Sequence, residues 1–283
     1  MKNTEIALKA LGGGGGCLRL NTTLERIFKK HFAQLFNKRT TFFRSFFIRN
    51  AFHIRNTTNG FTLAEVLITL GIIGVVAAMT LPTLVNKYQK RTYITGLQKF
   101  YTQISQVMLS IKQQTSCEDM SCMGFDGTLD TKWVENAKKL FKENYQILKF
   151  CYGSTTCEYE AFFVNGSSSG KIFTANEFAF KTSDGFIIKI MPWSENWSSL
   201  TVDVNGPKRP NTIGRDIHLF RINKNGEVHP YYGYKYAQTQ DGSFNPNLYW
   251  KTNPNLCNPQ STTSNGSYGC TARIIEEGWE MNF

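Results

Sequence analysis

The chain has few of the residues from which active sites are usually built. Only 4 of its 283 residues are histidine, and those beyond residue 60 are His218 and His229. Neither stands with a serine or cysteine in a recognisable nucleophile motif. The sequence also contains no P-loop and no Gly-x-Gly-x-x-Gly fingerprint. These absences weaken an enzymatic interpretation, and we expect the protein not to be an enzyme.

Acidic residues are scarce at the front of the chain. Residues 1–60 hold 11 Lys or Arg and 2 Asp or Glu, a net charge of +9, whereas the remainder holds 21 and 19, a net charge of +2. The overall charge of +11 therefore belongs mainly to the front segment. The nearly neutral body lacks the basic stripe with interleaved aromatics that is typical of nucleic-acid binding. We expect that no nucleic-acid partner is required.

Cysteines are also few, and six of the seven lie beyond residue 60 in three groups of close neighbours. They are Cys117, Cys122, Cys151, Cys157, Cys257 and Cys270. An even set of local pairs suits disulfides in an oxidising compartment. Many connectivities are open, and pairing between neighbours is the simplest expectation. The alternatives are free buried thiols in a cytosolic protein and metal or redox chemistry, which the absence of Cys-x-x-Cys spacing disfavours.

One long apolar run stands out, at residues 61–81. With a rise of about 1.5 Å per residue, a helix of this length matches the ~30 Å hydrocarbon core of a bilayer. It carries a single carboxylate, Glu65, near its front end. Pro82 follows; it removes a helical hydrogen bond and should kink the helix. The run predicts a transmembrane segment, in which the presence of one acidic residue requires an explanation.

Beyond Pro82 the helical pattern resumes. Apolar residues recur at steps of three and four, which predicts an amphipathic helix. They are Tyr88, Tyr93, Leu97, Phe100, Ile104, Val107, Met108 and Ile111. We therefore predict one helix over 62–114, with residues 61–81 in lipid and residues 82–115 outside the membrane.

In residues 116–283 the helical repeat gives way to short runs typical of strands, which predicts a β-rich globular domain. A further helix is expected at 131–144. Short runs typical of strands follow at 145–152, 159–164, 177–182, 186–191, 200–204, 217–222 and, close to the C-terminus, 271–275. Asp184-Gly185 and Asn225-Gly226 are tight-hairpin signals. Strands in series with short turns favour an antiparallel sheet, and residues 231–269 are loop-like. The expected fold class is α+β.

The stretch GFTLAEVLITLGIIGVVAAMTLPTLV, which begins at Gly60, resembles the N-terminal motif of type IV pilins and type II secretion pseudopilins. Gly60, Phe61, Thr62-Leu63, Glu65 and Pro82 carry the resemblance. It implies a pilin-like fold, with the long helix packed on the C-terminal sheet. It also implies that a prepilin peptidase cuts between Gly60 and Phe61 and methylates the new amine of Phe61. Residues 1–60 would then be a basic leader that is removed, or would reflect a misassigned start codon.

The resemblance also gives Glu65 a function. A carboxylate at bilayer depth costs roughly 2.5–3.5 kcal/mol on insertion scales and should have a partner. In the pilin family the partner is the N-terminal amine of a neighbouring subunit, so Phe61 and Glu65 would set subunit register. The implied partners are other copies and other pilin-like subunits, the prepilin peptidase, an inner-membrane assembly platform and membrane lipid. The implied location is the bacterial inner membrane, single-pass with the C-terminal domain outside the cytoplasm, and then a filament in the periplasm or at the cell surface.

A second candidate site lies at Asp203, Asn205 and Asp216. Short-spaced Asp and Asn oxygens at a glycine turn suit a hard cation such as Ca²⁺. The pattern is not an EF-hand, because further acids and a closing Glu are missing. Some pseudopilins carry a calcium site in a loop of this region. The alternative is a plain Asx-type turn.

Two other interpretations of the N-terminal region stay open. A conventional signal peptide could be cleaved before Met79, because Val76 and Ala78 satisfy the small-residue rule. A signal-anchored extracytoplasmic binding protein that never polymerises is the leading functional alternative. Both leave Glu65 and the residues around it unexplained.

Overall fold

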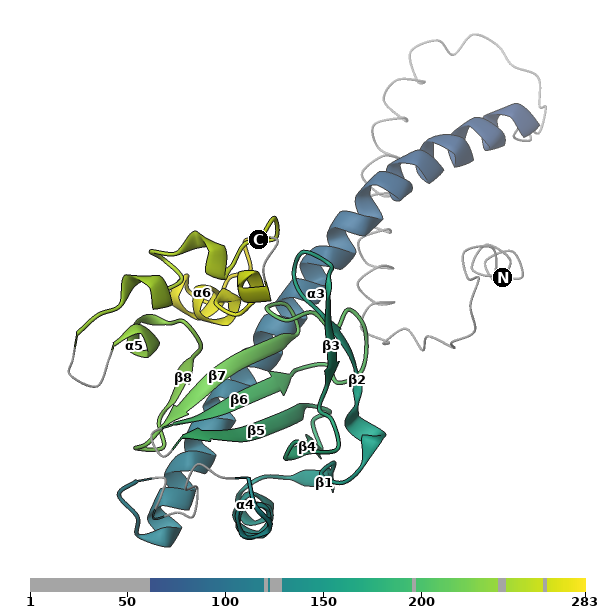
Figure 1. Cartoon of the computed structure of the whole chain (residues 1–283). Coiled ribbons are helices and arrows are strands. Elements are labelled where there is room, and N and C mark those ends of the chain that lie inside the picture. The colour runs from purple at the N-terminus through teal and green to yellow at the C-terminus, as the bar shows by residue number, and fades with distance from the viewer. Residues whose placement is uncertain (1–61, 120–121, 123–128, 195–196, 239–242, 262–263) are drawn as a thin grey trace, which may run out of the picture. The chain divides into compact units, whose positions relative to one another are not determined.

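The computed structural model describes residues 62–119, 122, 129–194, 197–238, 243–261 and 264–283 (Figure 1). Contacts within the chain divide it into two units, Met1–Gly71 and Ile72–Phe283. The helices are α3 (Leu63–Thr115), α4 (Thr131–Asn144), α5 (Tyr234–Ala237) and α6 (Cys270–Glu276). The strands are β1 (Ile147–Phe150), β2 (Tyr159–Phe162), β3 (Ser168–Ile172), β4 (Ala179–Thr182), β5 (Ile187–Ser194), β6 (Trp197–Asp203), β7 (Ile217–Asn223) and β8 (Val228–Pro230).

The long helix predicted from the sequence is confirmed to within one residue at each end. It continues through Pro82, and the kink expected there stays a prediction. The helix has two different halves, because no described residue before Tyr93 is buried. Its buried residues follow the predicted three- and four-residue steps and are Tyr93, Leu97, Phe100, Ile104, Val107, Met108 and Ile111.

The antiparallel sheet is also confirmed. Six strands lie in the order β1-β4-β5-β6-β7-β8, all paired antiparallel, and β2 and β3 form a separate hairpin. Asp184-Gly185 joins β4 to β5 and Asn225-Gly226 joins β7 to β8, as their hairpin signals predicted. Gly185 and Gly226 have φ of +91° and +80°, values that glycine adopts without a steric penalty.

Aromatic packing joins the buried face of α3 to one face of the sheet. Phe100 lies 5.5 Å from Phe220 on β7 and 6.5 Å from Phe186 before β5, measured between ring centroids. The helix α4 packs beside them, since the Trp133 ring meets Phe178 edge-on at 5.2 Å. These residues belong to one hydrophobic core within Ile72–Phe283.

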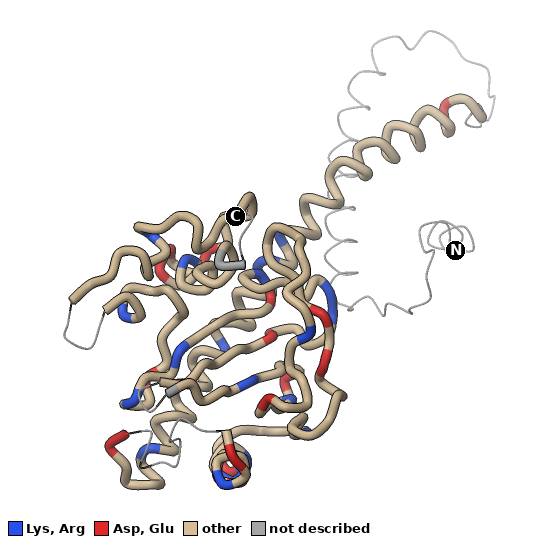
Figure 2. Tube along the Cα trace, in the orientation of Figure 1, with Lys and Arg blue, Asp and Glu red and all other residues tan. Residues whose placement is uncertain are grey.

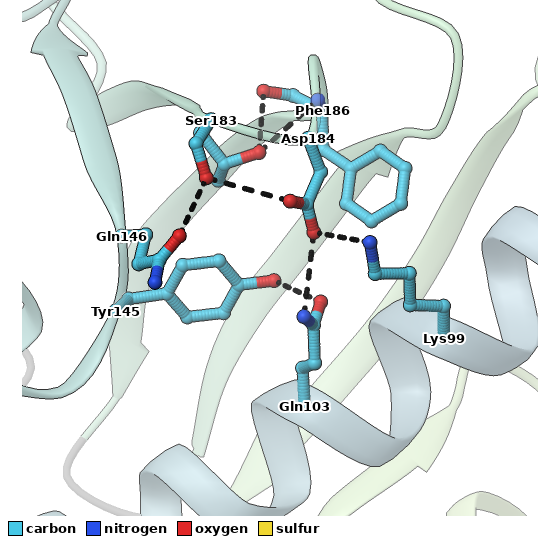
Figure 3. A network of polar contacts seen from close by, with 8 residues as sticks. Lys99, Gln103, Tyr145, Gln146, Ser183, Asp184 and Phe186 are labelled. Carbon is cyan, nitrogen blue, oxygen red and sulfur yellow. Dashed lines mark hydrogen bonds and ion pairs between the residues drawn. The ribbon is translucent and has the colours of Figure 1, made fainter.

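A polar network fastens the turn between β4 and β5 to α3 (Figure 3). Asp184 accepts hydrogen bonds from Lys99 at 2.9 Å and from Gln103 at 3.3 Å. The hydroxyl of Tyr145 donates a hydrogen bond to Oε1 of Gln103 at 3.0 Å. These contacts hold the pKa of Asp184 below its ordinary value, mainly through the hydrogen bond from Lys99. Lys99 is half-exposed, so we expect the network to fix geometry more than it adds stability.

The sequence analysis was wrong or incomplete at three elements. Residues 271–275, expected as a strand, lie in helix α6, which buries Cys270, Thr271, Ala272 and Ile274. An ion pair at 3.2 Å from Arg273 to Glu277 supports this helix, because residues four apart are neighbours on a helical surface. The strand β3 was not predicted, since its sequence is short and polar, and β8 was indicated only through the Asn225-Gly226 hairpin signal.

The expected pairing of neighbouring cysteines is confirmed. The three pairs lie at disulfide distance: Cys117–Cys122, Cys151–Cys157 and Cys257–Cys270. Each closes a short loop, and the last joins the loop region before residue 269 to helix α6. Stapling by disulfides suits a domain whose C-terminal part is largely loop.

We predict that Phe100→Ala lowers the free energy of unfolding of the full chain by about 3–5 kcal/mol, because it empties a fully buried aromatic site. The measurement is denaturant unfolding of the protein in detergent, followed by near-ultraviolet circular dichroism. The matched control is Gln98→Ala on the exposed side of the same helix, which should change stability by less than about 0.5 kcal/mol. Equal effects of the two substitutions would contradict the packing described.

Candidate functional site

The first site lies at the start of α3. Gly60 and Phe61, the predicted processing residues, fall outside the described residues. Glu65 lies in the first turn, where its Oε2 accepts hydrogen bonds from the Thr62 amide at 2.9 Å and from the Thr62 hydroxyl at 2.8 Å. The Glu65 amide donates back to the Thr62 hydroxyl at 3.3 Å. This reciprocal arrangement is a capping box, and it explains locally why Thr-x-x-Glu begins the helix.

Within the described residues no basic side chain forms an ion pair with Glu65. The carboxylate is exposed, and one of its two oxygens is engaged by Thr62. A negative charge at this position interacts favourably with the helix dipole, because the N-terminal end of a helix carries partial positive charge. The cap therefore positions Glu65 and leaves it able to accept from a donor on another chain.

The half of α3 that follows Glu65 is apolar and uncovered. An 18-residue window of the helix reaches a mean hydropathy of 2.2, and none of that window is buried. From Leu63 to Tyr88 the only acidic residue is Glu65, and Figure 2 shows this part of the helix in tan apart from red near its start and the basic residues. The large apolar residues that are exposed between the start of the helix and Tyr88 include Leu63, Leu67, Ile68, Leu70, Ile72, Val75, Val76, Met79 and Leu84. An apolar surface of this extent is typical of a membrane or helix-packing interface.

The second site is a pair of buried acids, Asp203 at the end of β6 and Asp216 just before β7. Both are completely buried. Oδ2 of Asp203 accepts a hydrogen bond from the hydroxyl of Tyr159. Its Oδ1 accepts one from the backbone N–H of Asn205 at 2.9 Å. The Asn205 side chain also lies beside Asp216. The structure therefore brings together the three residues that the sequence suggested.

The loop before β7 satisfies the second acid in the same way. The amides of Asn211 and Thr212 donate to the two oxygens of Asp216, at 2.9 Å and 2.6 Å. Asx-type hydrogen bonds thus fold the loop around both carboxylates. The Gly206 backbone also hydrogen-bonds Asp203, and the Asn205 side chain also hydrogen-bonds Asp216, so each carboxylate has at least three partners.

Burial dominates the electrostatics of this pair. It raises the pKa of Asp203 to about 8, with a further upward contribution from the charge of Asp216 and opposing hydrogen bonds from Tyr159 and the loop amides. Burial likewise raises the pKa of Asp216. Two carboxylates held together away from water favour a proton or a cation between them.

Two residues whose backbone N–H groups hydrogen-bond the acids also have a buried side-chain oxygen without a hydrogen-bond partner among the described residues. They are Asn205 and Asn211. Sequence reasoning missed Asn211 as well as Tyr159, which reaches the site from β2, 44 residues earlier. Asn211 lies in the loop between Asn205 and Asp216, so its position in the sequence could have suggested it. Nothing in the sequence relates Tyr159 to Asp203. Within the described residues, this site included, no group of three or more His, Cys, Asp or Glu side chains gathers as metal ligands do.

Comparison with known proteins identifies the first site. Residues 55–81 match the family model described as the prokaryotic N-terminal methylation motif. No curated protein and no solved structure matches the chain. The motif is the signature of type IV pilin and pseudopilin precursors. The chain therefore carries the N-terminal motif of prepilin-like precursors, the class that prepilin peptidase processes, and its long apolar helix fits a single-pass inner-membrane anchor.

We predict that Tyr159→Phe destabilises the protein by about 1–3 kcal/mol, because it removes the donor to a buried carboxylate oxygen. Urea unfolding measures the effect. Tyr152→Phe, at a partly exposed ring, is the control and should be close to neutral. In an Asp203→Asn background the cost of Tyr159→Phe should change, and strict additivity would show that the two side chains do not interact.

Proposed function

We propose that the chain is a structural subunit of a type IV pilus or a type II secretion pseudopilus and assembles into a helical filament. The observation that carries this proposal is the uncovered apolar half of α3 with one capped carboxylate, Glu65, at its head. In a filament, the apolar halves of neighbouring helices would cover one another. The domain from residue 116 onward would face outward and contact other components. The activity proposed is assembly and contact and not catalysis.

The N-terminal chemistry follows from the methylation motif. Cleavage between Gly60 and Phe61 would create an amine one helical turn before Glu65. An amine of a neighbouring subunit, offset along the axis, could donate to the carboxylate oxygen that Thr62 leaves open. The pair would neutralise two charges at bilayer depth, where an isolated carboxylate costs roughly 2.5–3.5 kcal/mol. Because the contact forms at one offset, it would also set subunit register.

We predict that Glu65→Val leaves processing intact and abolishes filament assembly. The measurement pairs intact mass and N-terminal sequence, expected to show a methylated Phe61, with the yield of sheared filaments. Glu135→Val, at an exposed position in α4, is the control and should assemble normally. Filaments of normal yield from the Glu65 variant would contradict the proposed pairing.

The alternative functions give different termini and different localisation. A conventional signal peptide would leave a mature chain that begins at Met79 and lacks the apolar half of α3. A signal-anchored binding protein would keep the helix and remain with membranes after shearing. The apolar surface alone does not separate an anchor from a subunit, whereas the methylation motif matched at residues 55–81 favours the subunit.

We further propose that the loop around Asp203 and Asp216 binds Ca²⁺. The two unpartnered buried oxygens of Asn205 and Asn211 support this proposal, because calcium takes six to eight oxygen ligands. The bound ion would neutralise the buried acids and fasten the loop before β7. The same loop without an ion would be an Asx-type turn that holds a proton between its carboxylates.

Roughly millimolar Ca²⁺ should raise the melting temperature of the full chain, as expected for an extracellular site. Mg²⁺ at the same concentration should do less, because it requires near-octahedral geometry and gives up water reluctantly. Asn205→Ala should fold and respond less to Ca²⁺. An equal response of wild type and variant, or none in wild type, would leave the loop as a plain turn.

A further inference from the structure

A row of stacked side chains crosses the face of the sheet that points away from α3. Leu200 and Val202 of β6 pack in the core with α3, so Trp197 and Ser199, which alternate with them, point to the other face. Arg221 pairs with Ser199 across the β6–β7 ladder and therefore shares that face with Trp197. The guanidinium carbon of Arg221 lies 4.8 Å from the centroid of Trp197.

The row extends in both directions. Beyond Arg221, the ring of Tyr236 in α5 lies 5.4 Å from the guanidinium carbon. The ring centroid of Tyr231 lies 4.5 Å from that of Tyr236 and 6.2 Å from that of Trp197, so these rings surround Arg221. On the other side, Trp193 stacks on Trp197 with centroids 5.4 Å apart and planes 24° from parallel. We call Trp193, Trp197, Arg221, Tyr236 and Tyr231 the aromatic ladder.

An irregularity in strand pairing places the last rung. The register of β5 against β6 shifts between Pro192 and Ser194, so Trp193 is an extra residue in its strand. Such bulges re-aim a side chain, and here the bulge coincides with the indole that stacks on Trp197. Trp193 remains 69% exposed, which is more than the nearby exposed aromatic residue of α5, Tyr234, at 53%. The ladder therefore presents a flat indole, held in place from behind, to solvent.

The charges around the ladder indicate what could bind there. Arg221 is half-buried between two rings, and its Nε is buried with no hydrogen-bond partner among the described residues. Close by, Lys235 and Glu227 carry opposite charges. A phosphate backbone needs several accessible cations beside its aromatic platforms. Arg221, the one cation of the ladder, is enclosed by rings, so the ladder itself offers no accessible cation to a phosphate, and this favours an uncharged ligand.

We propose that the exposed indole of Trp193 is a binding platform for a neutral glycan built from β-linked, gluco-configured pyranose rings. In such rings the hydroxyl groups are equatorial and the axial C–H bonds point from both faces. Their partial positive charge matches the negative face of the indole, the electrostatics that favour edge-to-face aromatic pairs. The hydroxyls at the ring edge remain free for water and neighbouring polar groups. This site does not depend on filament assembly.

The test is calorimetric titration of the full chain with cellohexaose and chitohexaose, in a detergent whose head group is not a sugar. Wild type should bind at least one of them saturably. Trp193→Leu, which keeps apolar bulk and removes the flat ring, should weaken binding by about tenfold or more, in the range found for loss of one aromatic stack. Trp193→Tyr should retain most of the affinity. Leu148→Ala, at a similarly exposed residue of β1, is the control and should bind as wild type does.

Several results would overturn the proposal. If wild type binds neither oligosaccharide, or Trp193→Leu binds as well as wild type, the indole is not a glycan platform. Oligothymidylate and oligoproline, titrated in parallel, test the other ligand classes that stack on aromatic rings. Binding of either through Trp193 in place of the glycans would assign the platform to a nucleic acid or a peptide and contradict the proposal.

Discussion

The structure from Ile72 onward depends on the packing of one face of α3 against one face of the antiparallel sheet. Leu97, Phe100 and Ile104 are completely buried in that interface, and the aromatic side chains of β7 and the β4–β5 hairpin meet them there. Because the buried interface begins at Tyr93, nearly all residues from Leu63 to Tyr88 are exposed, whereas Lys90 donates hydrogen bonds to main-chain oxygens of Met281 and Phe283. A single helix thus supplies the core of the domain at one end and an apolar surface for other contacts at the other.

The opposite face of the sheet is treated in two ways. Near Asp203 it is covered by the β2–β3 hairpin, whose Tyr159 satisfies a carboxylate that would otherwise be buried without a donor. Towards Trp193 it carries the aromatic ladder, which ends in solvent. Buried acids and an exposed indole both cost free energy in a folded domain. Their presence on one face separates it from the core-facing side, where the residues are apolar and enclosed.

Much of this arrangement could be predicted from the sequence. Residue spacing predicted α3 within one residue at each end and α4 at Thr131–Asn144, because long amphipathic patterns specify helices locally. Asp184-Gly185 and Asn225-Gly226 predicted their hairpins through the backbone conformation that glycine allows. The helix α6 was mistaken for a strand, since a segment as short as residues 271–275 fits either period and only its burial beside β7 decides.

The sequence by itself determined the membrane-length helix, the Thr62–Glu65 cap and the order of helix before sheet, all of which depend on residues close together in the chain. The methylation motif belongs to the same category, because it is read from consecutive residues. Only the tertiary structure decided that Tyr159 contacts Asp203 and that Trp193, Arg221 and Tyr236 form one ladder. These contacts join residues far apart in sequence, and strand register and a bulge fix them through pairing that no local pattern encodes.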